Sequence, residues 1–120
     1  MNTLIMNEFV EKGFEISNRS WKYNGQKPCV IDFMADWCLP CKTISPILEQ
    51  LEKEYGNKID FFTVNVDEQY DFVELFLIKS VPTLVFCPGN GKKSETIIGS
   101  SSKQKIEEKL KNLLPEKSFV

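Results

Sequence analysis

The stretch VIDFMADWCLPCK, residues 30–42, places two cysteines directly after an apolar run. The run over residues 30–35 predicts a strand buried on both faces, and the residues after Cys41 predict a helix. At such a junction, Cys38 and Cys41 can open and close a disulfide with little backbone movement. The free N–H groups that begin a helix stabilise a thiolate, the species that attacks disulfides. The stretch therefore predicts thiol–disulfide chemistry.

Strands that alternate with helices are predicted around this junction. Pro46 falls inside the long helix and is expected to kink it. Alternation predicts an α/β protein, and a final hairpin adds antiparallel strands to the sheet. The expected elements are a short helix within residues 4–16, an edge strand at 21–23, a strand at 30–35, a helix from 38 or 40 to 55, a strand at 59–66, a helix at 70–76, strands at 81–87 and 93–98, and a helix at 102–114.

The size and charge of the chain exclude several classes of protein. A length of 120 residues predicts one domain, and a net charge of -2 gives no electrostatic case for binding nucleic acid or an anionic membrane. No apolar stretch approaches the roughly 18 residues that a membrane-spanning helix needs. The N-terminal MNTLIMNE is a poor signal peptide because it has no basic region. We therefore expect a cytoplasmic protein, although a mature form without its leader would look the same.

The sequence contains no histidine. This excludes Cys–His and Ser–His nucleophilic mechanisms and every histidine metal ligand. A CxxC pair can also form half of a zinc or iron–sulfur site, but such a site needs further ligands. The chain has no second CxxC, so we expect no metal. We also expect no bound cofactor, because two thiols can carry both electrons.

Asp32 is the one charged residue in the expected buried strand. A buried carboxylate is costly unless it is paired or protonated, and burial raises its pKa. A raised pKa suits a carboxyl group to move a proton near neutral pH. The alternative is an aspartate that faces water at a strand end, but the position between Ile31 and Phe33 favours burial.

Seven separated segments resemble the thioredoxin family, over about residues 28–114. They are VIDF at 30–33, ADWC at 35–38, CK at 41–42, PIL at 46–48, VNVD at 64–67, VPTL at 81–84 and IG at 98–99. The resemblance implies the thioredoxin fold, a central mixed β-sheet flanked by helices on both faces. It implies a single domain over residues 1–120, with residues 1–27 as an N-terminal extension.

The same resemblance implies a protein-disulfide reductase that maintains cell redox homeostasis. Its implied partners are disulfide-containing client proteins and a flavoprotein disulfide reductase as electron donor, and we expect a monomer. Two alternatives stay open: an exported disulfide oxidant or isomerase, and a non-catalytic binding module with the same fold. A high reduction potential would favour the first alternative. Full biological activity without the two thiols would favour the second.

The resemblance also implies roles for individual residues. Cys38 is expected to attack client disulfides, and Cys41 to resolve the mixed disulfide with Asp32 as its proton acceptor. The Val81–Pro82 bond is expected to be cis, although most X–Pro bonds are trans. The backbone of Val81 is then expected to pair with an extended segment of the client.

Three further residues are expected to line the client groove, namely Trp37, Ile98 and Gly99. Pro40 favours the first helical turn, and Leu39 stands where thioredoxins usually carry glycine. The Leu39–Pro40 dipeptide is expected to help set the thiolate pKa and the redox potential. Two other departures are Met34, in place of a frequent aromatic residue, and Thr63, in place of a frequent lysine. Without that lysine, the pKa of Asp32 is expected to be higher.

Cys29 and Cys87 fall outside the motif. In the thioredoxin fold their strands are antiparallel neighbours, and both residues would lie at the end away from the active site. They could therefore be close in space. We expect two buried free thiols, because structural disulfides are uncommon in reducing compartments. A disulfide between them is the alternative.

Overall fold

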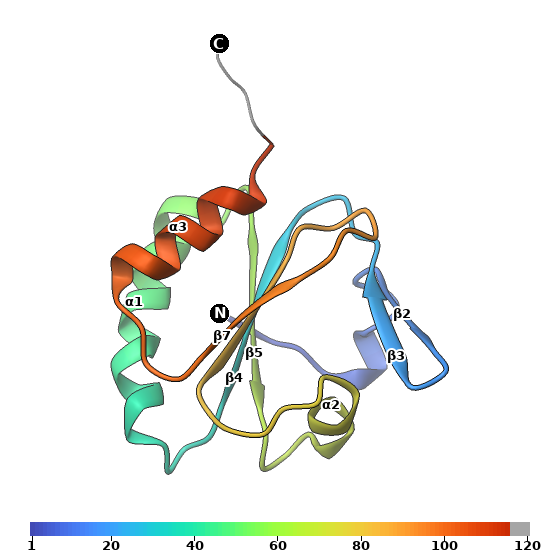
Figure 1. Cartoon of the computed structure of the whole chain (residues 1–120), viewed down its shortest axis with the longest axis horizontal. Coiled ribbons are helices and arrows are strands. Elements are labelled where there is room, and N and C mark those ends of the chain that lie inside the picture. Colours follow the sequence, from blue (N-terminus) through green and yellow to red (C-terminus); the bar gives the residue numbers. More distant parts are fainter. Residues whose placement is uncertain (116–120) are drawn as a thin grey trace.

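The computed structural model describes residues 1–115, which form seven strands, three α-helices and one short 3-10 helix (Figure 1). The bounds are β1 (Asn2–Thr3), η1 (Met6–Glu8), β2 (Phe14–Ser17), β3 (Ser20–Tyr23), β4 (Cys29–Met34), α1 (Leu39–Tyr55), β5 (Asp60–Asn65), α2 (Tyr70–Leu75), β6 (Thr83–Cys87), β7 (Glu95–Ile98) and α3 (Lys103–Leu113). None of the helices in these residues has the length and apolar character that crossing a bilayer requires.

The central feature is a five-stranded mixed sheet with the strand order β1-β5-β4-β6-β7. The middle strand β4 pairs with β5 in parallel and with β6 in antiparallel orientation. Helices α1 and α3 cover one face of this sheet, and α2 covers the other face together with the β2–β3 hairpin (Figure 1). This arrangement confirms the expected fold, a mixed sheet with helices on both faces.

Strand β4 is apolar almost throughout because both of its faces are buried. Side chains alternate between the two faces of a strand. Ile31 and Phe33 accordingly belong to one core cluster, together with Phe72 of α2. Val30 belongs to the cluster on the other face, together with Ile44 of α1. The two clusters explain why the apolar run over residues 30–35 predicted the central strand correctly.

Helix α1 begins directly after Cys38, whose side chain caps it. Pro40 lies in the first helical turn, where a missing N–H is not needed. The residues that α1 buries recur at helical spacing and are Cys41, Ile44, Leu48 and Leu51. Pro46 lies inside this helix, which is assigned continuously from Leu39 to Tyr55. The kink expected at Pro46 stays a prediction.

The N-terminal segment differs from the sequence expectation. The helix predicted within residues 4–16 is wrong: this region forms only the short η1 and then strand β2. The chain turns at Gly13, where φ is +107°, a value that glycine adopts readily. The strand expected at 21–23 is confirmed as β3, but it pairs with β2 in a separate two-stranded sheet. Its apolar side chains pack on the central sheet, and it is no edge strand of that sheet.

We propose that residues 1–27 unfold together with the rest of the chain as one unit. Phe9 stacks on Phe14 with ring centroids 4.3 Å apart and meets Phe72 edge-on at 5.2 Å. We expect Phe9→Leu to lower the free energy of unfolding by about 1 to 2 kcal/mol, because it loses these ring contacts in a packed core. Urea denaturation followed by far-UV circular dichroism tests this. An unchanged main transition would mean that the segment unfolds separately.

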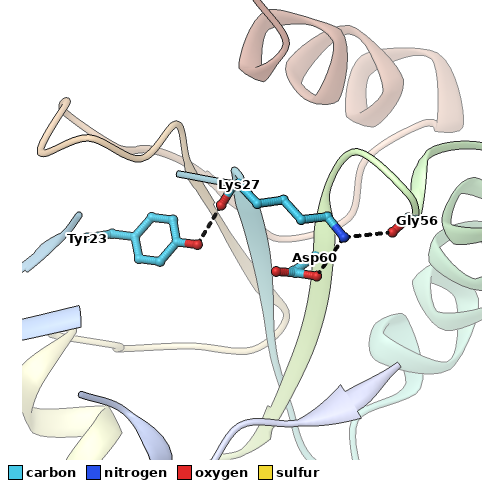
Figure 2. Close-up of polar contacts among 4 residues, drawn as sticks. All are labelled: Tyr23, Lys27, Gly56 and Asp60. Carbon is cyan, nitrogen blue, oxygen red and sulfur yellow. Dashed lines mark hydrogen bonds and ion pairs between the residues drawn. The ribbon is translucent and has the colours of Figure 1, made fainter. Parts of the chain in front are cut away.

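A polar cluster closes the end of the sheet where β4 and β5 begin (Figure 2). The Lys27 ammonium donates to the carbonyl oxygen of Gly56 at 3.2 Å and lies 3.1 Å from the carboxylate of Asp60. The Tyr23 hydroxyl donates to the carbonyl oxygen of Lys27 at 2.5 Å. These contacts tie the hairpin and the entry of β4 to the end of α1.

Candidate active site

Cys38 and Cys41 lie at the start of α1 and are joined by a disulfide, with their Cα atoms 5.3 Å apart. The backbone N–H of Cys41 donates to the sulfur of Cys38 at 3.1 Å. Once the disulfide opens, the Cys38 sulfur therefore sits where an N-terminal N–H group and the helix dipole stabilise negative charge. This geometry favours the thiolate form of Cys38.

Exposed apolar side chains stand on either side of Cys38 in the sequence and at the end of β7. Trp37 is 67% exposed, Leu39 is 73% exposed and Ile98 is 70% exposed. Apolar side chains this exposed gain by becoming covered, so they favour contact with another molecule. The partial exposure expected for Trp37 is thus confirmed.

Trp37 is held in place by a residue that sequence reasoning left without a role. Its indole N–H donates to the carboxylate of Asp67 at 2.8 Å, and the backbone N–H of Asp67 donates to Asn65 at 2.9 Å. Asp67 closes the VNVD segment at 64–67, which was noted for its resemblance only. An indole N–H needs a hydrogen-bond acceptor to be held in one orientation. The acceptor here lies thirty positions along the chain, and the sequence alone does not identify it.

The segment at 81–82 lies beside the disulfide. The Val81–Pro82 peptide bond is cis, as the resemblance implied. Val81 packs against a small cluster that contains Cys38 and Cys41. Gly99 donates its N–H to the carbonyl oxygen of Pro82 at 2.9 Å, which joins the end of β7 to this segment.

Gly99 leaves open space at this position. Its φ is +88°, and a side-chain carbon added there would meet no other atom within 4 Å. A residue with a side chain would be strained at this φ, so glycine is favoured here. Because glycine has no side chain, the backbone stays accessible. The structure brings Val81, Pro82, Ile98 and Gly99 together where β6 begins and the neighbouring strand β7 ends.

Asp32 is only 4% exposed and lies on the face of β4 that α1 covers. Within residues 1–115, its Oδ1 atom has no hydrogen-bond partner. Burial raises the pKa of Asp32 from 3.8 to about 7, because the charged form loses its hydration. The burial expected for Asp32 is confirmed.

A cavity of about 430 Å³ joins Asp32 to Cys41. Thr63 and Lys42 also line it. The Thr63 hydroxyl donates to the backbone oxygen of Asp32 at 3.4 Å. It therefore does not donate to the carboxyl group of Asp32. The cavity is large enough for several waters, which could carry a proton between the carboxyl group and the thiol.

Metal binding has no support in the part of the chain that the structure describes. Residues 1–115 contain no group of three or more Cys, Asp or Glu side chains placed to hold a metal ion. The site that remains is a dithiol with a buried carboxyl group beside it and an apolar rim. This arrangement can exchange disulfides and move a proton near neutral pH.

Comparisons with known proteins agree with this chemistry. The family model described as Thioredoxin matches residues 14–112. A thioredoxin of Borreliella burgdorferi is 43% identical over 91 residues, which cover 75% of this chain and 78% of that protein. A thioredoxin of Buchnera aphidicola is 34% identical over 108 residues, which cover 90% and 94%. The crystal structure of a Malassezia sympodialis thioredoxin matches with a TM-score of 0.73 and 31% identity, and the match covers 92% of this chain and 87% of that one.

Proposed function

The chain belongs to the thioredoxin family and is a thiol–disulfide reductase, and we propose that Cys38 is its nucleophile, Cys41 its resolving thiol and Asp32 its proton acceptor. The observation that carries this assignment is the hydrogen bond from the Cys41 N–H to the Cys38 sulfur, 3.1 Å long, at the start of α1. It favours negative charge on Cys38 over Cys41. The thiol that ionises first is the one that attacks.

The proposed reaction moves two electrons from the dithiol to the client. The Cys38 thiolate attacks one sulfur of the client disulfide, so a mixed disulfide forms and the first client thiolate leaves. Cys41 then loses its proton to Asp32, through the shared cavity, and attacks the sulfur of Cys38. The second client thiolate leaves, and the Cys38–Cys41 disulfide is restored.

We propose that the exposed apolar rim binds an extended segment of the client. The backbone of Val81 would pair with this segment, and the open space at Gly99 would admit it. Leu39 adds apolar surface directly beside Cys38. The rim therefore favours clients with apolar side chains next to the disulfide.

The effect of the rim can be tested with Ile98→Ser and the control Val10→Ser. Both original side chains are 70% exposed, but Val10 lies in the N-terminal segment, outside the proposed groove. We expect Ile98→Ser to raise the KM for a protein disulfide about tenfold, from lost apolar burial, and Val10→Ser to leave it unchanged. Reduction of a small-molecule disulfide should stay at the wild-type rate in both. Equal effects of the two variants would contradict the assigned groove.

Thioredoxins act on disulfides and are returned to the dithiol state by reductase partners, and for this chain we propose a flavoprotein as the electron donor. We further propose a cytoplasmic monomer. The equilibrium reduction potential of the Cys38–Cys41 pair tests the direction of the reaction, by titration against a dithiothreitol buffer. A potential of about -270 mV would mean a reductant, as proposed. A potential of about -120 mV would mean an oxidant and would favour an exported compartment.

A further inference from the structure

A second pair of cysteines lies at the far end of the same two central strands. Cys29 is the first residue of β4, Cys87 is the last residue of β6, and the two are direct partners in the antiparallel register. Directly opposed residues in such a pair have Cα atoms about 4.5–5.5 Å apart, with both side chains on one face. A disulfide spans about 4.4–6.8 Å between Cα atoms, so this register can accommodate one without moving the strands.

The two thiols are free and fully buried. They belong to the core cluster that α2 and the hairpin cover, whereas Asp32 and the cavity lie on the opposite face of β4. Cys29 shares this cluster with Cys87 and Tyr23, and burial is the largest cause that raises the pKa of its thiol. Cys29 therefore stays protonated, and both thiols are shielded from reagents by burial while the surrounding structure is closed.

The segments that flank this pair are loops held by hydrogen bonds to one another and to the start of β5, where the Asp60 N–H donates to the carbonyl oxygen of Pro28 at 2.9 Å. Asn90 and Gly91 follow Cys87 and donate their N–H groups to the carbonyl oxygens of Gly25 and Tyr23, at 3.0 Å and 2.9 Å. The Tyr23 hydroxyl binds the carbonyl of Lys27, two residues before Cys29 (Figure 2). Loop segments held by such hydrogen bonds open locally without global unfolding. Such opening would admit a small oxidant to both sulfurs.

We propose that Cys29 and Cys87 form a second dithiol, which hydrogen peroxide oxidises to a disulfide that links β4 to β6. In the first step, one thiol attacks a peroxide oxygen, which gives a sulfenic acid and one water. The other thiol then attacks the sulfenic sulfur, so the S–S bond forms and a second water leaves. The two thiols lose two electrons and two protons, and one peroxide is reduced to two waters.

This site is separate from the active site. Phe33 lies four positions after Cys29 in β4, which is about 13 Å along the strand at the usual rise. Because β4 and β6 are already paired in this register, the new bond would fix an arrangement that exists in the reduced protein. The exchange activity of Cys38 and Cys41 should therefore survive the oxidation. The added crosslink should raise resistance to unfolding, since it restricts the unfolded chain.

The test uses a full-length Cys38→Ser/Cys41→Ser variant, in which Cys29 and Cys87 are the only thiols. After treatment with hydrogen peroxide, we expect the mass of the linked peptides that carry Cys29 and Cys87 to be lower by two hydrogen atoms than the sum of the two reduced peptides. We also expect a higher urea midpoint, and both changes should be reversed by dithiothreitol. The same variant with Cys29→Ser in addition is the control, because it cannot close the bond.

Three outcomes would overturn the proposal. Both thiols could still react with an alkylating agent after the treated protein is unfolded, added oxygen atoms could be found on Cys29 or Cys87 themselves, or covalent dimers could form. The unmutated protein provides a second measurement that does not depend on the serine variants. After peroxide treatment and proteolysis under non-reducing conditions, a peptide linking Cys29 to Cys87 should appear beside the Cys38–Cys41 peptide. Its absence would also refute the proposal.

Discussion

Cys41→Ser should hold client proteins as stable mixed disulfides, whereas Cys38→Ser should capture none. In the first variant Cys38 can still attack, but no second thiol releases the client. In the second variant the nucleophile itself is missing, and Cys41 lies one helical turn further in and lines the cavity that it shares with Asp32. We expect both variants to lose about a thousandfold or more in turnover of a protein disulfide, because the two thiols act as a unit.

The two variants are compared by non-reducing electrophoresis with a disulfide-containing model protein. The double variant Cys38→Ser/Cys41→Ser serves as the control for association without a covalent bond. Adducts of Cys41→Ser should disappear when dithiothreitol is added. Capture by Cys38→Ser alone would mean that Cys41 is the nucleophile and would reverse the roles assigned from the hydrogen bond between them.

The region around β4 and α1 was predictable from the sequence because its contacts leave a local pattern. A strand covered on both faces must be apolar at every position, which made Asp32 stand out as the exception. The N-terminal segment has no such pattern. The large apolar residues Leu4, Phe9 and Phe14 recur every fifth position, which fits neither a helix nor a strand. Their packing partners are remote, so only the folded structure shows what they contact.

Two features of the site also depend on distant parts of the chain. The cis bond before Pro82 could be expected only from the resemblance, because an isolated X–Pro bond favours trans. The role of Asp67 depends on Trp37, which the fold brings within 2.8 Å of its carboxylate. The register that opposes Cys29 and Cys87 likewise follows from the pairing of β4 with β6. From the sequence, Cys29 and Cys87 could be expected to lie close together only because the resemblance implied a fold in which their strands are neighbours.

Asp32 should make the oxidised protein less stable as the pH rises. Its pKa is 3.8 in the ordinary case and about 7 in the folded protein, because it is buried without a compensating cation. Between these pH values the folded state keeps a proton that the unfolded state has lost. The unfolded state therefore binds fewer protons, so the free energy of unfolding falls with pH over this window. The total loss above the upper pKa amounts to about 4 kcal/mol.

Asp32→Asn should remove most of this loss, since the amide does not ionise. Urea denaturation of the oxidised protein at about pH 5 and about pH 8 measures it, and the variant should exceed the wild type in stability only at the higher pH. Asp36→Asn is the matched control, because it removes the same charge at an exposed position near the site. That control should keep the wild-type pH dependence. The pH dependence of stability could instead be the same for wild type and Asp32→Asn. The Asp32 carboxyl group would then ionise in the folded protein as readily as in the unfolded chain. In that case it would not serve as the proton acceptor for Cys41.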